Sequence, residues 1–207
     1  MPKIVDPQER RARIADAVFA LIERGGVQEA SLRNVAAAAG LNIGSVRHYV
    51  DGHEGMLVVA VHEMARRVEA RIEAEIAAFD SRPPGERGDR DDEALGEHAI
   101  DLLEQLLPLD AERRREVVVW LAFCEWSRVT PALAAQARVL IDGSRRLTRP
   151  MLAAAGVPPG ALEPAAESLA AAVDGLAIAL LHDPDRLSHQ QRRAILRVQL
   201  AASLSWR

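Results

Sequence analysis

Residues 43–50, IGSVRHYV, carry three neighbouring side chains that are suited to binding a polyanion. Arg47 can donate two hydrogen bonds to O6 and N7 of a guanine, while His48 and the hydroxyl of Tyr49 can reach phosphate oxygens. A hydrophobic core needs none of these polar groups, and Tyr49 is the only tyrosine in the chain. The stretch therefore predicts a surface that binds nucleic acid.

Flanking residues add further predicted DNA contacts. Gly44 removes a side chain, so the start of its helix can approach the sugar-phosphate backbone closely, where free N–H groups favour anions. Ser45 can donate to a phosphate or a base edge, while Arg33 and His53 are placed to contact backbone phosphates, which fixes the register of the protein on DNA. The predicted DNA-binding residues are Arg33, Asn42, Ile43, Gly44, Ser45, Arg47, His48, Tyr49 and His53.

Three short helices are predicted to position these side chains. Ser31 is a good N-cap for a second helix that Gly40 ends, and Asn42 can cap a third. On this third helix, Val46 and Val50 share one side with Tyr49 and face inward. Two helices joined by a glycine turn form a helix-turn-helix when the second can enter the major groove. Periodicity alone does not decide between two alternatives. It is equally consistent with a DNA-binding unit and with a three-helix unit that never contacts DNA.

The order of residues 31–57, SLRNVAAAAGLNIGSVRHYVDGHEGML, resembles the DNA-binding domain of the TetR family of bacterial transcriptional repressors. The resemblance extends over roughly residues 7–57, and it implies a dimer that binds a palindromic operator and is released by a small-molecule effector. Three positions depart from the family pattern: Arg47 replaces an aromatic residue, Val50 a phenylalanine and His53 a lysine. A neutral imidazole carries no charge, so the phosphate contact of His53 is expected to be weaker and pH-dependent. Residues 180–204 resemble the BetI-like C-terminal subgroup.

The rest of the chain is predicted to be helical as well. Helices are expected at about 54–79, 92–107, 110–128, 131–155, 163–182 and 188–204, with a proline- and glycine-rich loop over 80–92. Pro150 is expected to kink or split the 131–155 helix. The predicted fold class is all-α, with about nine helices. A helix-turn-helix domain over residues 1–53 precedes an effector-binding and dimerisation domain over residues 54–207.

The segment 117–126, VVVWLAFCEW, is apolar on almost every side, as a helix buried all round would be. It holds three aromatic side chains and the single cysteine. A small-molecule site needs a concave apolar wall with a few polar groups, and plain core packing remains the alternative for each of these residues. The predicted effector-binding residues are His98, Trp120, Phe123, Cys124 and Trp126.

The last two predicted helices, 163–182 and 188–204, mix small residues with leucines, which allows close contact between helices. Paired with the same helices of a second copy, they would form a two-fold symmetric four-helix bundle, so they are the predicted homodimer surface. The residues expected to form it are Leu169, Ala172, Val173, Leu176, Leu180, Ile195, Val198 and Ala202.

Bulk composition restricts the remaining possibilities. The net charge is −4, but residues 1–53 carry +1 and the remainder −5, so positive charge is enriched at the N-terminal end. One cysteine excludes an intrachain disulfide. With no signal peptide pattern and no long uncharged apolar run, we expect a cytoplasmic protein without a membrane partner.

No nucleophile–base pair, phosphate-binding loop or cofactor motif is evident, so we expect no enzyme activity and no cofactor. The acids and histidines of the turn at residues 182–189 are interpreted as turn and cap chemistry, and no metal site is predicted. The alternative function is a helical small-molecule-binding protein or enzyme with an incidental helix-turn-helix.

Overall fold

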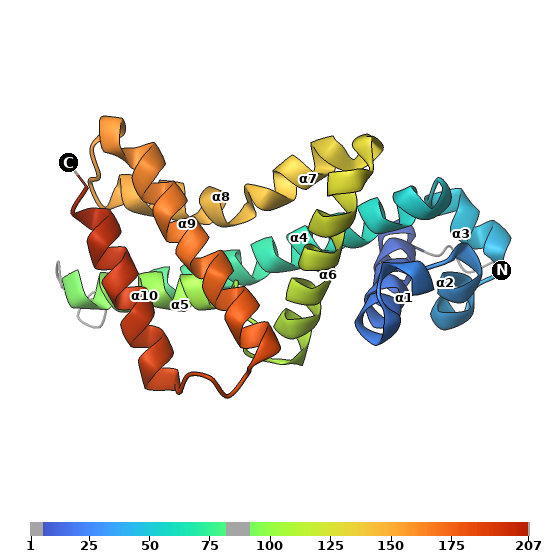
Figure 1. The fold of residues 1–207 in the computed structure, drawn as a ribbon, viewed down its shortest axis with the longest axis horizontal. Coiled ribbons are helices and arrows are strands. Elements are labelled where there is room, and N and C mark those ends of the chain that lie inside the picture. Colours follow the sequence, from blue (N-terminus) through green and yellow to red (C-terminus); the bar gives the residue numbers. More distant parts are fainter. Residues whose placement is uncertain (1–5, 82–91, 207) are drawn as a thin grey trace. The chain divides into compact units, whose positions relative to one another are not determined.

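The computed structural model describes residues 6–81 and 92–206, so most of the predicted 80–92 loop lies outside the described residues. The regular elements in these two ranges are all helical, which confirms the predicted fold class (Figure 1). The elements are α1 (Pro7–Gly25), η1 (Val27–Glu29), α2 (Leu32–Ala39), α3 (Ile43–Tyr49), α4 (Gly52–Asp80), α5 (Asp92–Glu104), α6 (Ala111–Val129), η2 (Pro131–Leu133), α7 (Ala134–Ile141), α8 (Gly143–Ala154), α9 (Pro159–His182) and α10 (His189–Leu204).

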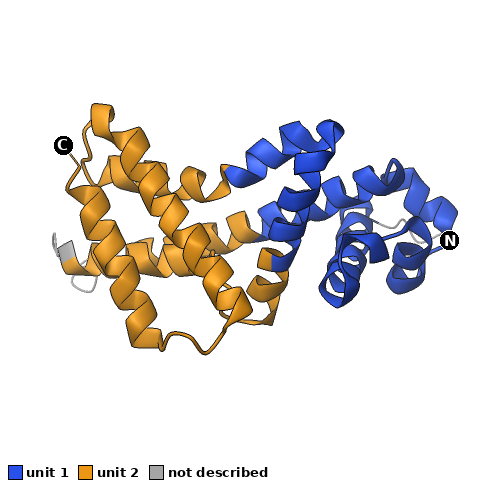
Figure 2. Cartoon of the chain, viewed as in Figure 1, with its two compact units in different colours: residues 1–67, 118–141 blue, residues 68–117, 142–207 orange. Residues whose placement is uncertain are grey.

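The chain packs as two compact units, coloured separately in Figure 2. Unit 1 comprises residues 1–67 and 118–141, and unit 2 comprises residues 68–117 and 142–207. Two helices, α4 and α6, each contribute residues to both units. The predicted boundary after residue 53 concerns function rather than packing, and it stays a prediction.

Unit 1 surrounds one hydrophobic cluster that includes residues from the first four helices and from α6. Phe19 of α1, Val35 of α2 and Val46 of α3 are buried in it together with Met56 of α4 and Phe123 of α6. Burying a large apolar side chain contributes about 1.5–3 kcal/mol. The C-terminal part of α6 is therefore part of the core that supports the helix-turn-helix.

Unit 2 is built by α8 packing on α9, α9 on α10, and α10 on α5. Leu152 of α8, Leu169 of α9 and Leu196 of α10 are almost fully buried. The buried hydroxyl of Thr148 donates to the carbonyl oxygen of Ala166 at 3.1 Å, which satisfies a polar group between α8 and α9.

Ion pairs join α5 to α10. The guanidinium of Arg193 lies 2.8 Å from Glu97, 2.7 Å from Asp101 and 2.8 Å from Glu104. Arg197 also pairs with Glu97, at 2.6 Å. Hydrogen bonds from Arg197 and then Arg193 lower the pKa of Glu97 to about 2. These charge-assisted contacts fix the register of α10 on α5.

The predicted helix over 131–155 is wrong in detail. The segment splits at Asp142 into α7 and α8, and Pro150 lies inside α8 without ending it. Asp142 and Gly143 are both weak helix formers, which favours a break between them. Pro150 removes only the bond to the carbonyl of Arg146, and both residues are exposed, so water can hydrate that carbonyl.

The residues expected at the dimer surface divide between two environments. Leu169, Val173, Leu176 and Leu180 are buried within the single chain. Of the large apolar residues on α9 and α10, Ile178, Ile195, Val198 and Leu204 are exposed instead. The face of α9 that carries the leucines is thus already covered, because α8 and α10 pack against this helix.

One described helix, α9, is long and apolar enough to cross a membrane by length and composition, although no long uncharged run is predicted from the sequence. Half of its most apolar window is buried inside the protein. A core helix of a soluble protein passes the same test, and the packing of α9 on two neighbours accounts for its apolar character.

We expect Gly40→Ala to lower the free energy of unfolding by about 1–2 kcal/mol, because Gly40 has φ +63° and this left-handed conformation is costly for a residue with a Cβ. An added Cβ would meet only the Arg13 guanidinium at 3.5 Å, so the cost is conformational rather than steric. Urea denaturation measures this change in the free energy of unfolding. Gly143→Ala is the matched control, since Gly143 begins a helix and has open space around it; equal losses from both variants would contradict the argument.

Candidate nucleic-acid interface

Caps at both ends of the turn position α3 against α2. The Ser31 hydroxyl accepts a hydrogen bond from the Asn34 amide at 3.2 Å, and Gly40 ends α2 in the left-handed conformation. The side-chain oxygen of Asn42 accepts from the Ser45 amide at 2.7 Å and caps α3. The three predicted cap and turn residues are confirmed, and they produce a helix-turn-helix.

One side of α3 is buried and the other is open to solvent. Val46 and Val50 are buried, while Gly44, Arg47 and His48 are exposed. Ile43 is also exposed, at 42 %. Asn42 is exposed and Ser45 is half-buried. The exposed residues form one continuous face at the start and outer side of the helix.

Two cations on this part of unit 1 have no partner among the described residues. Within the ranges that the structure describes, neither Arg33 nor Arg47 forms an ion pair or side-chain hydrogen bond, and both are exposed. An exposed guanidinium without a carboxylate partner keeps its five donors available. These donors are what a phosphate or a guanine edge requires.

Tyr49 differs from its two neighbours on α3. Its ring is half-buried and packs against the core of unit 1, and it meets the His48 ring edge-on at a centroid distance of 5.2 Å. Tyr49 therefore helps to hold α3 in place, and only part of the side chain is available to a partner.

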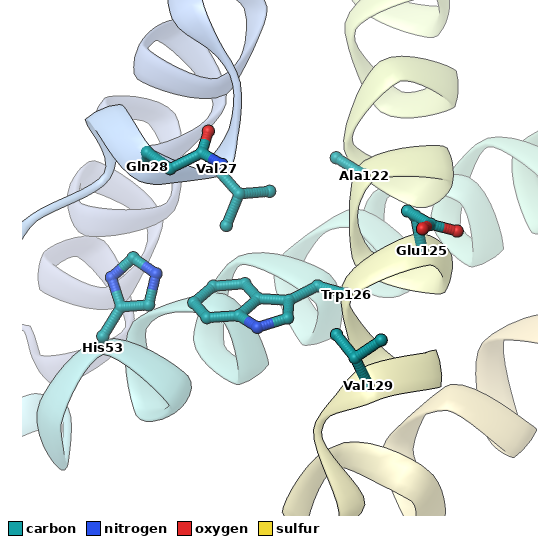
Figure 3. A pocket seen from close by; sticks show the side chains of 7 residues that line it. All are labelled: Val27, Gln28, His53, Ala122, Glu125, Trp126 and Val129. Atoms are coloured by element: carbon teal, nitrogen blue, oxygen red, sulfur yellow. The ribbon is translucent and has the colours of Figure 1, made fainter.

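His53 lies in the first turn of α4 beside Trp126 of α6. The ring centroids are 4.3 Å apart with an interplanar angle of 53° (Figure 3). Burial lowers the pKa of His53, and this effect outweighs the backbone hydrogen bond at Ala30 and the charge of Glu54, which raise it. The structure thus places a predicted DNA-binding residue against a predicted effector-binding residue, a contact that sequence reasoning missed.

These two rings lie in a cavity of about 490 Å³ within unit 1. Trp126 extends from α6 toward His53, while Val27 lies above them and Val129 follows Trp126 on α6 (Figure 3). The Glu125 carboxylate is largely exposed and pairs with Arg128 at 2.7 Å. The lining residues are Val27, Gln28, His53, Ala122, Glu125, Trp126 and Val129.

Of the five predicted effector-binding residues, only Trp126 lines this cavity. Phe123 is 1 % exposed and belongs to the core, and the partly buried Trp120 packs against the same core. Cys124 is half-buried on the same helix. His98 belongs to unit 2, where it stacks on Phe79 at 4.0 Å. Helical periodicity could not identify the η1 residues of the lining, because they are distant in sequence from α6.

Comparison with known proteins places this geometry in a family. Residues 96–205 match the family model of the BetI-type transcriptional repressor C-terminal domain. The chain is 30% identical over 198 residues to the HTH-type transcriptional regulator PksA of Bacillus subtilis (strain 168), covering 95% of this chain and 90% of that protein.

Solved structures agree. The fold is similar to that of a transcriptional regulator from Rhodococcus sp. Rha1, with a TM-score of 0.74, 29% identity, and coverage of 94% of this chain and 95% of that one. It is also similar to the multidrug binding protein EbrR complexed with imidazole, with a TM-score of 0.64, 26% identity, and coverage of 96% and 93%.

The lowered pKa of His53 predicts an acid-sensitive unit 1. The unfolded chain takes up a proton at this imidazole more readily than the folded chain, so stability is lost as pH falls from the unfolded-state pKa of about 6.5 toward the lower folded-state pKa of His53. We expect the Tm of the native protein to fall between pH 7.5 and 5.5 more steeply than that of His53→Gln, as measured by circular dichroism. His62→Gln, which removes an exposed imidazole from the same helix, is the control. Identical pH profiles for the native protein and His53→Gln would contradict the assignment.

Proposed function

Because this chain belongs to the TetR family of transcriptional regulators and carries a BetI-type C-terminal domain, we propose that it represses transcription as a homodimer on a palindromic operator. A small-molecule effector releases it from the DNA. Like its relatives, the chain is a transcriptional regulator and not an enzyme. Family members bind DNA as dimers with small-molecule effectors. The observation that carries the operator proposal is the solvent-exposed Arg47, which has no partner among the described residues, on a capped helix whose opposite side is buried.

Each of the nine predicted DNA-binding residues has a role in this proposal. Arg47 reads a base edge through its guanidinium, and Ser45 and Ile43 contact bases or sugars beside it. Arg33, His48 and the hydroxyl of Tyr49 contact phosphates. Asn42 and Gly44 act mainly through the backbone: a Cβ at Gly44 would lie 3.3 Å from the capping oxygen of Asn42, so the glycine also protects the cap. His53 contributes a phosphate contact only when its imidazole leaves Trp126.

The homodimer is proposed to form through α9 and α10. Their outward stripes are exposed and combine small residues with the exposed Ile178, Ile195 and Val198. Exposed apolar stripes on two adjacent helices favour a four-helix bundle with the same stripes of a second copy. Two recognition helices then read two half-sites, which a single seven-residue helix cannot do selectively.

The effector is proposed to bind in the unit 1 cavity, against Trp126. The cavity has the size of a small-ligand site, and it combines an indole face and two valines with a few polar groups. The multidrug binding protein EbrR, which shares the fold and 26% identity, is known in complex with the small heterocycle imidazole, and this supports a ligand-binding role. A regulator that acts on DNA is proposed to be cytoplasmic.

Arg47→Ala is expected to relax discrimination at one base position of each half-site by about 1–3 kcal/mol, because the bidentate contact is lost. Arg33→Ala should weaken binding to all sequences alike and reduce the salt slope by about one per subunit. A binding titration against upstream DNA and single-base variants, at two salt concentrations, distinguishes the two effects. Arg186→Ala removes the same charge from an exposed turn of unit 2 and is the control. Unchanged sequence preference in Arg47→Ala would refute base reading by this residue.

Val198→Asp is expected to raise the dimer dissociation constant by about a hundredfold, since it places an unpaired carboxylate in the proposed interface. Sedimentation equilibrium measures this change. Val139→Asp is matched to it, because Val139 is a similarly exposed valine on α7 of unit 1. If the dimer dissociation constant of Val198→Asp rises no more than that of Val139→Asp, the interface lies elsewhere.

A further inference from the structure

Three side chains with metal-binding chemistry converge in unit 2, whereas the helix-turn-helix residues and the cavity described above belong to unit 1. Glu75 comes from α4, and His98 and Asp101 come from α5, where a spacing of three residues places them on one helix face. One ligand atom of each lies within 4.8 Å of the other two. All three side chains are half-buried.

We propose that Glu75, His98 and Asp101 form a binding site for a divalent transition metal ion, with Zn²⁺ as the best match. An imidazole nitrogen with two carboxylate oxygens suits Zn²⁺ and its neighbours in the first transition series, whereas Mg²⁺ and Ca²⁺ favour oxygen ligands alone. Ligand distances of about 2.0–2.2 Å to zinc require the three atoms to move closer together than the 4.8 Å within which they now lie. The flexible side chain of Glu75 can make this adjustment.

Neighbouring residues already orient two of the three ligands. The ring of His98 stacks on Phe79 with a centroid distance of 4.0 Å and an angle of 12°, which fixes the plane of the imidazole. Oδ1 of Asp101 accepts a hydrogen bond from Arg193 at 2.7 Å, and its second oxygen remains for a metal. Outer partners of this kind orient metal ligands and tune their basicity.

Local charge also favours a cation. Four acids lie in this region, and three arginines of α10 pair with three of them. The acids are Glu75, Glu97, Asp101 and Glu104, and the arginines are Arg192, Arg193 and Arg197. Within the part of the chain that the structure describes, Glu75 itself forms no ion pair. A half-buried carboxylate without a cationic partner is a ready ligand for an added ion.

No second such cluster occurs among residues 6–81 and 92–206. The histidines and aspartates at 182–189, which the sequence also places close together, do not bring three ligand atoms within reach of one another there. Water or a small anion would complete the coordination, because a half-buried site with three protein ligands keeps an open position.

Zinc titration of the metal-free, tag-free protein by isothermal calorimetry tests the site. We expect one Zn²⁺ per chain and a rise in Tm on addition of zinc. Glu75→Gln and Asp101→Asn keep the side-chain shape and should each weaken binding at least about tenfold. His98→Gln should do the same, and Co²⁺ bound in place of zinc should give visible absorption bands that these variants lose.

His182→Gln and Asp185→Asn are the controls, since both residues belong to the turn at 182–189. Zinc affinity that falls in the controls but survives Glu75→Gln and His98→Gln would overturn the proposal and locate the ion at the turn. Absence of heat and of any Tm rise in excess zinc would overturn it as well. Glu75→Gln is the decisive variant, because it leaves the ion pairs of α5 and α10 intact.

Discussion

A seven-residue helix cannot maintain itself in water, and the arrangement of unit 1 depends on that constraint. Helix nucleation is unfavourable, and isolated helices of this length are not stable. The conformation of α3 is therefore set from outside, by the Asn42 cap and by burial of Val46 against α1, α2 and the start of α4. Because the inward side chains supply the stability, the outward ones are free to be chosen for a partner.

Local signals explain which features are predictable from the sequence. A cap, a left-handed glycine and a helical stripe are encoded within a few residues, so the roles of Ser31, Gly40 and Asn42 follow from residue type and spacing alone. The exposed and buried sides of α3 follow from the same periodicity. The contact between His53 and Trp126 is not predictable in this way, because it joins helices that meet only through tertiary packing.

Two errors have the same origin. The leucines of α9 are predicted to face a second copy, yet α8 and α10 cover them, and periodicity identifies an apolar face without identifying what lies on it. The predicted break at Pro150 rests on the residue type, whereas the outcome depends on the exposure of the carbonyl that the proline frees. Sequence patterns do not reveal Glu75, His98 and Asp101 as a group, because their convergence depends on how α5 packs beside α4.

The single aromatic contact between His53 and Trp126 sets a scale for how strongly the cavity can influence the start of α4. Such pairs contribute about 0.5–1.5 kcal/mol beyond the area they bury. A ligand that competes for the indole withdraws this aromatic contribution from the contact, which corresponds to a change in an equilibrium of about twofold to tenfold. On that scale, a ligand that acts through this contact alone would shift the balance between two arrangements of the start of α4 only in part, and both arrangements would stay populated at saturation.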